Sequence, residues 1–412
     1  MKKMGFHYYP DTDHYRAADL ERWLPKLLDL KADFLVLQAP VERAVPESFL
    51  FGLKQAQIEP ILHFSLPVDQ SPGVDGLALL LETYARWGVK YVIFFDRPNS
   101  KDSWSCSNWT QTNLVERFLD IFLPFAEAAV RVGLVPIFPP LEQGGDYWDT
   151  TFLRDALEGL QRRASETLLK RLILSADGCF NQHPLDWGSG GPERWPEAQP
   201  YRTPDSSEDH RGFRIIDWYL MLSETVLEKK LPILLLKIHG EDTQSENVVD
   251  QLMHSVDLLT GVEIEGSEPL PEELIGGSYW LLTADDPETS AQQVWIRPEG
   301  TGSPAAVRLL EKFQSAKPKA ADTFFIPHYL LLPSFDWGVS DWHLEVIHDF
   351  IKRHQPTIGF SLAEASRAEQ VTVLGGKEYF AEEKINQLRS KGCLVRRVTG
   401  DGTNIASQLA AL

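Results

Sequence analysis

The sequence predicts an α/β protein built around a (β/α)8 TIM barrel, followed by a C-terminal extension and a small α/β unit. Three observations support this prediction. Short apolar runs alternate with segments of helical length, eight such units occupy about 280 residues, and no strand leads into a glycine-rich phosphate turn. An open doubly wound sheet has the same local alternation and is the alternative fold.

The eight predicted strands are short and largely apolar, as is typical of parallel strands buried on both faces. Ile233-Leu-Leu-Leu and Tyr91-Val-Ile-Phe-Phe are two examples. In chain order we expect the strands at 5–9, 33–38, 60–66, 90–96, 134–139, 171–177, 232–240 and 277–283. Amphipathic stretches between them predict helices, for example at 18–30, 77–87, 114–132 and 152–169.

The pattern changes after the eighth strand, which suggests a division of the chain. We expect residues 1–320 to form the barrel, 321–370 a connecting helical and extended segment packed on it, and 371–412 a small βαβα unit. Within the barrel, the connection at 178–214 is long and holds several Trp residues. Because long connections in compact domains are usually functional or disordered, and large aromatics are unusual in a floppy linker, we expect an ordered loop over the barrel mouth.

Composition excludes several classes of partner. The chain has 412 residues, 59 acidic and 40 basic, and a net charge of −19, so nucleic acid and anionic membranes would be repelled. Its three Cys residues are too widely spaced for a disulfide framework or a zinc pair. No apolar run is long enough for a membrane span. The N-terminus has no apolar signal region, so we expect a soluble protein, either cytoplasmic or a mature form whose leader was removed.

The ends of the predicted strands gather carboxylates, imidazoles and aromatic rings. Active sites of barrels lie at the C-terminal ends of the strands, and a glycosidase needs two carboxylates there. The catalytic candidates are Glu142, Glu241 and Asp96, with Asp146 and Asp177 behind them. For each of these acids a solvated loop position or a salt bridge is the alternative interpretation.

A second set of residues is expected to bind an oligosaccharide or polysaccharide. Tryptophan rings in the C-terminal loops suit stacking against the C–H face of a sugar, and they also anchor loops. The predicted binding residues are Tyr8, His63, Arg97, Asn99, Trp104, Trp148, Asp177, Trp187, His239 and Trp280. His7, His63 and His239 with Asp177 could also be interpreted as metal ligands. Their spacing lacks an H-x-H or H-E-x-x-H element, so we predict no metal and no cofactor.

Three elements of the chain carry a resemblance to a known group of enzymes. They are the aromatic first strand end Phe6-His-Tyr-Tyr, the Asp96-Arg-Pro-Asn element after strand four, and Tyr279-Trp280 near the end of strand eight. With these, residues 1 to about 285 resemble the (β/α)8 glycoside hydrolases of the large retaining clan, whose acid/base follows strand four and whose nucleophile follows strand seven. The resemblance implies hydrolysis of O-glycosidic bonds.

The chain also departs from that clan. An Asn-Glu pair usually follows strand four, whereas this chain has Asp96-Arg97-Pro98-Asn99, and Glu241 lies a step into the loop after Lys237-Ile-His-Gly. Either the pair has been relocated, with Glu142 as one member, or the barrel binds carbohydrate without hydrolysis. A metal-dependent barrel enzyme is a third possibility.

The last 42 residues resemble a bacterial cell-wall-binding repeat. The resemblance rests on Val371-Thr-Val-Leu-Gly-Gly, a predicted helix, and the following Gly392-Cys-Leu-Val-Arg-Arg-Val-Thr-Gly. A small βαβ capping unit is the alternative interpretation. The oligomeric state is not predicted.

Overall fold

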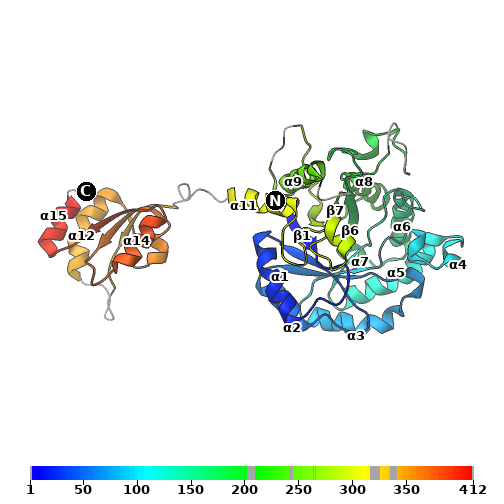
Figure 1. Ribbon diagram of the computed structural model, residues 1–412, viewed down its shortest axis with the longest axis horizontal. Coiled ribbons are helices and arrows are strands. Elements are labelled where there is room, and N and C mark those ends of the chain that lie inside the picture. Colours follow the sequence, from blue (N-terminus) through cyan, green and yellow to red (C-terminus); the bar gives the residue numbers. More distant parts are fainter. Residues whose placement is uncertain are drawn as a thin grey trace. The chain divides into compact units, whose positions relative to one another are not determined.

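The computed structural model describes residues 2–201, 209–240, 245–262, 264, 266–315, 325–334 and 341–410. The chain divides into two compact units, Met1–Glu311 and Lys312–Leu412. Each unit is built on a parallel sheet with helices packed against it (Figure 1).

The first unit is the predicted (β/α)8 barrel. Its strands are β1 (Lys3–His7), β2 (Phe34–Gln38), β3 (Glu59–Phe64), β4 (Tyr91–Phe94), β5 (Val135–Ile137), β6 (Leu174–Cys179), β7 (Ile233–His239) and β8 (Leu274–Tyr279). They are hydrogen-bonded in the order β5-β4-β3-β2-β1-β8-β7-β6, and every pair is parallel. A further parallel bridge between Ile137 and Ile173 brings the two ends of this order together. All eight strands lie where the sequence predicts them, although β8 begins three residues earlier.

Helices surround the strands of the barrel (Figure 1). The longer ones are α1 (Ala17–Asp29), α2 (Glu47–Gln55), α3 (Gly73–Arg86), α5 (Leu114–Arg131), α6 (Asp149–Arg163), α8 (Ile215–Leu227), α9 (Glu246–Thr260) and α11 (Pro304–Ser315), and α7 (Glu166–Arg171) has six residues. The shorter α4 (Cys106–Trp109) and α10 (Pro287–Gln292) lie in loops. The helix predicted at 152–169 is two helices, because Ser165 caps a new one by accepting a hydrogen bond from the Leu168 amide.

Branched apolar side chains fill the centre of the barrel. Phe34, Val36, Ile61, Ile93, Ile137, Ile173, Leu234 and Leu236 form one buried cluster. Alternate residues of β2 contribute to it, as expected where successive side chains point to opposite faces of a strand. On β1, Gly5 lies so close to β2 that a Cβ atom would stand 2.5 Å from the Phe34 ring. The absence of a side chain at this position therefore lets the two strands pair.

An irregularity in β7 changes which side chains face the barrel mouth. The register between β6 and β7 shifts at Ala176/Asp177, so that Leu236 has no partner on β6. The carbonyl of Leu236 accepts hydrogen bonds from His7 Nε2 at 2.6 Å and from Ser278 Oγ instead. A bulge of this kind shifts the alternation of the side chains that follow it. Lys237 and His239 consequently contact residues of the mouth.

The second unit contains a four-stranded parallel sheet in the order β10-β9-β11-β12. Its strands are β9 (Ile326–Leu331), β10 (Thr357–Gly359), β11 (Ala368–Leu374) and β12 (Leu394–Val398), and its helices are α12 (Asp341–His354), α13 (Leu362–Ala365), α14 (Glu382–Ser390) and α15 (Gly402–Ala410). Tyr329 and Leu331 share one buried cluster with α14, whereas Leu330 and Leu332 share another with α12 and α15. The sheet is therefore covered on both faces.

This arrangement differs from the expected domain boundaries. The first unit ends at Glu311 rather than at residue 320. The segment 321–370 supplies β9, α12 and β10 to the second unit, and β9 pairs with β11 directly. Pairing between strands distant in sequence is a tertiary contact that local patterns do not reveal. Residues 371–412 are thus half of a larger sheet and not a separate βαβα unit.

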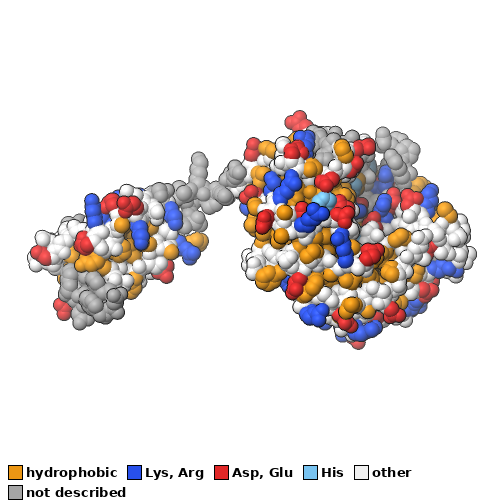
Figure 2. All heavy atoms as spheres, turned by 60° about the horizontal axis from the view of Figure 1, so that its bottom comes forward, with side chains coloured by type: hydrophobic (Ala, Val, Ile, Leu, Met, Phe, Trp, Pro, Cys, Tyr) orange, Lys and Arg blue, Asp and Glu red, His pale blue; other side chains and the backbone are white. Residues whose placement is uncertain are grey.

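The surface of the described residues is mixed in charge. Figure 2 shows acidic and basic side chains interspersed over the visible face of the barrel, although the sequence carries a net charge of −19. Of the helices in the described ranges, none combines the length and apolar character that a bilayer crossing requires.

Candidate functional site

The end of β4 carries a carboxylate surrounded by cations. Asp96 Oδ1 lies 3.6 Å from Lys237 Nζ, and its Oδ2 accepts a hydrogen bond from Arg97 Nε at 3.2 Å. Only 19% of the Asp96 side chain is exposed. Burial favours the neutral acid, but the charges of Lys237 and Arg97 outweigh it and hold the pKa of Asp96 at about 2. Asp96 is therefore ionised throughout the physiological range.

The backbone around Asp96 is strained. Phe95 has a φ of 70° and Arg97 a φ of 44°, in the left-handed region that side chains other than glycine rarely occupy. Backbone hydrogen bonds hold both residues there, from the Phe95 amide to Phe64 and from the Arg97 amide to Pro140. Such strain persists only where the surroundings enforce it, and it is common at functional sites.

Arg97 connects Asp96 to a second carboxylate. Its Nη1 atom lies 3.7 Å from Glu142 Oε2, and 43% of Arg97 and 44% of Glu142 are exposed. Glu142 follows β5, so the ends of two neighbouring strands contribute to one cluster. The sequence predicted both acids as catalytic candidates, and here they share one guanidinium group.

A second ion pair joins β6 and β7. His239 Nε2 lies 3.0 Å from Asp177 Oδ1. Burial disfavours the charged imidazole, but Asp177 outweighs it and raises the pKa of His239 to about 10. His239 also lowers the pKa of Asp177 against the opposing effect of burial. The pair is therefore an imidazolium and a carboxylate at neutral pH.

Neutral rings complete the cluster. Burial, followed by the charge of Lys237, lowers the pKa of His7 to about 3, so its imidazole is uncharged. The Trp280 ring lies 5.0 Å from the His7 ring and 4.9 Å from Lys237 Nζ. His63 Nε2 contacts the Phe95 carbonyl at 2.9 Å. No hydrogen-bond partner of His63 Nδ1 is found in the described ranges.

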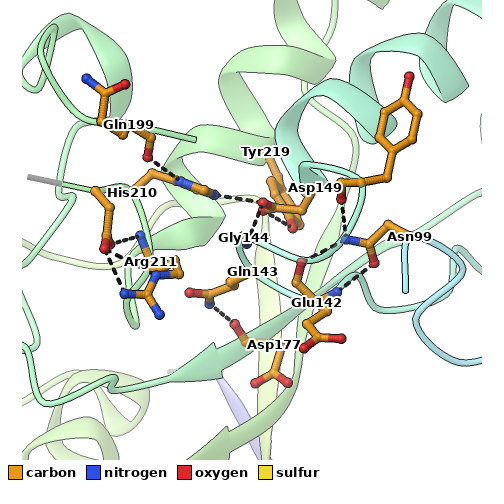
Figure 3. Close-up of polar contacts among 12 residues, drawn as sticks. Asn99, Glu142, Gln143, Gly144, Asp149, Asp177, Gln199, His210, Arg211 and Tyr219 are labelled. Atoms are coloured by element: carbon orange, nitrogen blue, oxygen red, sulfur yellow. Dashed lines mark hydrogen bonds and ion pairs between the residues drawn. The ribbon is translucent and has the colours of Figure 1, made fainter. Parts of the chain in front are cut away.

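The loop that carries Glu142 is held from the strand-four side by Asn99. The Asn99 Nδ2 group donates to the carbonyls of Glu142 and Tyr147, and its Oδ1 accepts from the Glu142 amide at 2.8 Å (Figure 3). Asn99 is fully buried. It therefore positions the loop, and its side chain is committed to the protein rather than to the predicted ligand.

Other predicted binding residues are also engaged in packing. Tyr8 is buried among the rings of Tyr9, Tyr15 and Phe49, beside α2. Trp104 is buried and donates to the Pro98 carbonyl. A ring that fills the space between a loop and its neighbour has the same sequence signature as one that meets a ligand, which is why local sequence did not separate them.

The remaining predicted residues divide into four cases. Trp187 stacks on His183 at 4.2 Å and donates to the Asp209 carbonyl, so it anchors the loop after β6. Trp148 is 44% exposed, and its ring lies 5.3 Å from that of Tyr201. Asp146 is paired with Lys101 at 3.3 Å. Glu241 lies outside the residues that the structure describes.

Four residues at or beside the site were not predicted. Lys237 was missed because the bulge in β7 decides where it points. Gln143 contacts the backbone of Asp177 and Gly212, and Asp149 pairs with His210 deep beneath the loops (Figure 3). Their partners are 34 to 69 residues away in the chain, so no local motif marks them. Within the described ranges, no group of three or more His, Cys, Asp or Glu side chains is arranged to hold a metal ion.

Comparisons with known proteins find similarity only at the level of structure. No protein-family model and no curated protein sequence matches this chain. An exo-β-1,4-mannosidase from Opitutaceae bacterium strain TAV5 is 10% identical, with a TM-score of 0.48 over 99% of this chain and 79% of that one. A GH5_18 protein from Bifidobacterium longum subsp. longum, in complex with Manβ1-4GlcNAc, is 12% identical, with a TM-score of 0.45 over 96% of both chains.

A GH128 endo-β-1,3-glucanase from Sorangium cellulosum is also similar. It is 12% identical, with a TM-score of 0.44 over 75% of this chain and 97% of that one. These structural neighbours are glycosidases. At such identities and TM-scores the similarity carries no argument for the activity of this chain, which has to be argued from its own residues.

Proposed function

We propose that the barrel is a glycoside hydrolase that binds an oligosaccharide or polysaccharide at its mouth, with Asp96 and Glu142 as its paired carboxylates. The observation that carries the proposal is the contact of Arg97 with both acids. Because both contacts are made by one planar guanidinium group, the nearest carboxylate oxygens lie no more than about 9 Å apart, so their separation does not exceed that of working pairs.

The environments of the two acids favour different roles. Asp96, with its pKa held at about 2, suits the residue that must stay ionised, the nucleophile or base. Glu142, the other carboxylate in contact with Arg97, would then take the role of the acid.

Other residues of the mouth would hold the sugar. Arg97 and His239 supply hydrogen-bonding groups, and Trp280 supplies aromatic surface beside Lys237 and His7. The exposed ring of Trp148, beside Tyr201, suits stacking against a sugar further from the reacting bond.

Binding without hydrolysis is a second candidate function, and one observation favours it. Asp96, Glu142 and Asp177 each lie within 4 Å of a cationic side chain, so no carboxyl among these three stands in an environment that keeps it neutral. A glycosidase acid must carry a proton before it reacts. The resemblance of the C-terminal residues to a cell-wall-binding repeat stays a prediction, and it would fit such a binding role.

A hydrolysis assay on a panel of glycans separates the two candidates. We would compare the wild type with Asp96→Asn and Glu142→Gln, and measure binding to the same glycans. Release of reducing ends by the wild type, abolished in both variants with binding retained, is the result expected of a hydrolase. Binding without release by any protein would replace hydrolysis with the second function.

A matched control guards against a general effect of removing charge. Asp102 is an exposed acid in the same loop after β4. The Asp102→Asn variant should keep the activity of the wild type, because this side chain is not part of the cluster at the mouth. Loss of activity in this variant would show that the assay responds to net charge and not to the proposed pair.

A further inference from the structure

His210 is held between two hydrogen-bond acceptors, although it lies completely buried. Its Nε2 atom is 2.8 Å from Asp149 Oδ1, and its Nδ1 atom is 3.0 Å from the carbonyl of Gln199 (Figure 3). A carbonyl oxygen can only accept, and an ionised carboxylate can only accept. Both ring nitrogens must therefore donate, which makes His210 an imidazolium.

Both carboxylate oxygens of Asp149 accept hydrogen bonds from neighbouring groups. Its Oδ1 also accepts from the Gly144 amide at 2.9 Å, and its Oδ2 accepts from the Tyr219 hydroxyl at 2.7 Å. Asp149 is completely buried at the start of α6, only seven residues after Glu142. The carboxylate thus holds the middle of the loop that carries the proposed acid.

A second contact joins the same two loops. Gln143 Oε1 accepts from the Gly212 amide at 2.8 Å, and Gln143 Nε2 donates to the Gly212 carbonyl at 3.1 Å and to the Asp177 carbonyl. Residues on both sides of Gly144 are therefore tied to the loop after β6. Asn99 holds the same loop from the opposite side, through the backbone of Glu142.

We propose that the buried Asp149–His210 pair is a positioning device for Glu142, which makes the reaction depend on the protonation of His210. The inference rests on the role proposed for Glu142 above. If the His210 imidazolium loses its proton, Asp149 faces a neutral ring. The ion pair that joins the loop after β6 to α6 is then lost. The Asp149 carboxylate that accepts from the Gly144 amide is then held less firmly, so the Glu142 loop is less well positioned.

The charges around His210 decide the direction of the pH dependence. His210 faces Asp149 on α6, whose carboxylate also accepts from the Tyr219 hydroxyl. His210 also faces Asp209 in its own loop, and Asp209 is itself paired with Arg211. Burial lowers the pKa of His210, but Asp149 and the Gln199 carbonyl outweigh it, so the pKa lies above its ordinary value. A group of this kind stabilises the fold at low pH, and its contribution is lost as the pH rises through the raised pKa.

The test combines hydrogen exchange with kinetics on the full chain. In His210→Gln we expect the Gly144 amide to exchange roughly tenfold faster, because its acceptor loses a charged hydrogen bond. In Asp149→Asn we expect the alkaline limb of the kcat profile to move to lower pH, because the carboxylate that stabilises the imidazolium is gone. A residue with a merely structural role would lower the rate without moving that limb.

Two further variants keep the test decisive. The double variant Asp149→Asn, His210→Gln leaves no unpaired buried charge, so we expect it to fold even if His210→Gln does not, and its kcat profile should lack any step that depends on His210. Ser223→Ala is the control. Ser223 is buried on α8, the helix that carries Tyr219, and its side-chain hydrogen bonds within the described residues join it to Lys229 and Leu231. This variant should leave Gly144 exchange and the pH profile unchanged.

The outcomes separate this inference from the proposed function. Unchanged Gly144 exchange in His210→Gln and in the double variant would overturn the positioning role, whether or not the protein hydrolyses a glycan. Faster exchange in a protein whose wild type hydrolyses nothing would support positioning of the Glu142 loop and reject the hydrolase proposal. Faster exchange with an unmoved alkaline limb in Asp149→Asn would overturn the dependence on His210 protonation.

Discussion

The barrel and the second unit are both parallel sheets, and the carboxyl ends of their strands differ in chemistry. In the barrel, β4, β6 and β7 lead into Asp96, Asp177 and His239, which are charged and largely enclosed. In the described part of the second unit, β9 leads into Leu332 and β11 into Gly375. The same architecture thus positions strand ends in both units. In the barrel, several strand ends bring charged side chains together, whereas in the described part of the second unit Arg397 near the end of β12 pairs with Glu382 of α14. A function must be argued from those residues and not from the fold.

The largest expected effect comes from the charge at the end of β4. We predict that Asp96→Asn lowers kcat by roughly 10²- to 10⁴-fold, the range for a lost acid/base function, without loss of glycan binding. Steady-state kinetics and isothermal titration on the same preparation measure the two quantities. An Asp96→Asn variant that retains most of the activity would remove the proposed distinction between the two sheets.

The next prediction concerns the second unit alone. Leu331 is fully buried in its core, and Leu331→Ala should destabilise that unit by about 2–5 kcal/mol, through lost apolar contact and the cavity left behind. Urea unfolding measures the loss, and glycan binding by the barrel should be unchanged. Equal loss of barrel function would show that the two units are coupled, contrary to a site confined to the barrel.

The pair between β6 and β7 predicts a dependence of stability on pH. The pKa of His239 is raised to about 10, so the pair contributes stability that is present below the ordinary imidazole pKa and is lost as the pH rises toward 10. We expect a loss of about 2 kcal/mol between pH 7 and pH 10, and a smaller loss in His239→Asn. Urea midpoints at three pH values measure it. A wild type and variant with parallel pH profiles would contradict the prediction.

The smallest expected effect on stability concerns Lys237. Removal of this cation in Lys237→Met should raise the pKa of Asp96, because Lys237 is the strongest of the charges that hold it down. The acid limb of kcat should move to higher pH, and stability should fall by about 1 kcal/mol, since Arg97 remains beside Asp96. An acid limb at the same pH as in the wild type would mean that Asp96 does not control it.

Much of the barrel could be predicted because its signal is local. Short apolar strands followed by amphipathic helices identify the fold, and the strand ends located His63, Asp96, Asp177 and His239 at the mouth. Glu142 was found in the same way, from its distance to the fifth strand. These predictions depend only on the alternation of elements along the chain and on the fact that parallel strands end at one edge.

The second unit could be predicted only in part, for the same reason. The strands at 371–374 and 393–398 have clear local patterns, and both correspond to strands of the sheet. The pairing of β11 with β9, and of β9 with β10, does not follow from any local pattern, because it joins segments separated by a helix or more. The predicted boundaries therefore failed where the partners were distant.

By itself, the sequence determined the barrel, the position of each strand end and the residue types available there. The tertiary structure decided which of these side chains meet. The bulge in β7 turned Lys237 toward Asp96, packing withdrew Tyr8 and Asn99 from the mouth, and folding brought His210 to Asp149 across 61 residues of chain. Alternation along a chain is a local property, whereas burial and charge pairing depend on contacts that exist only once distant segments have come together.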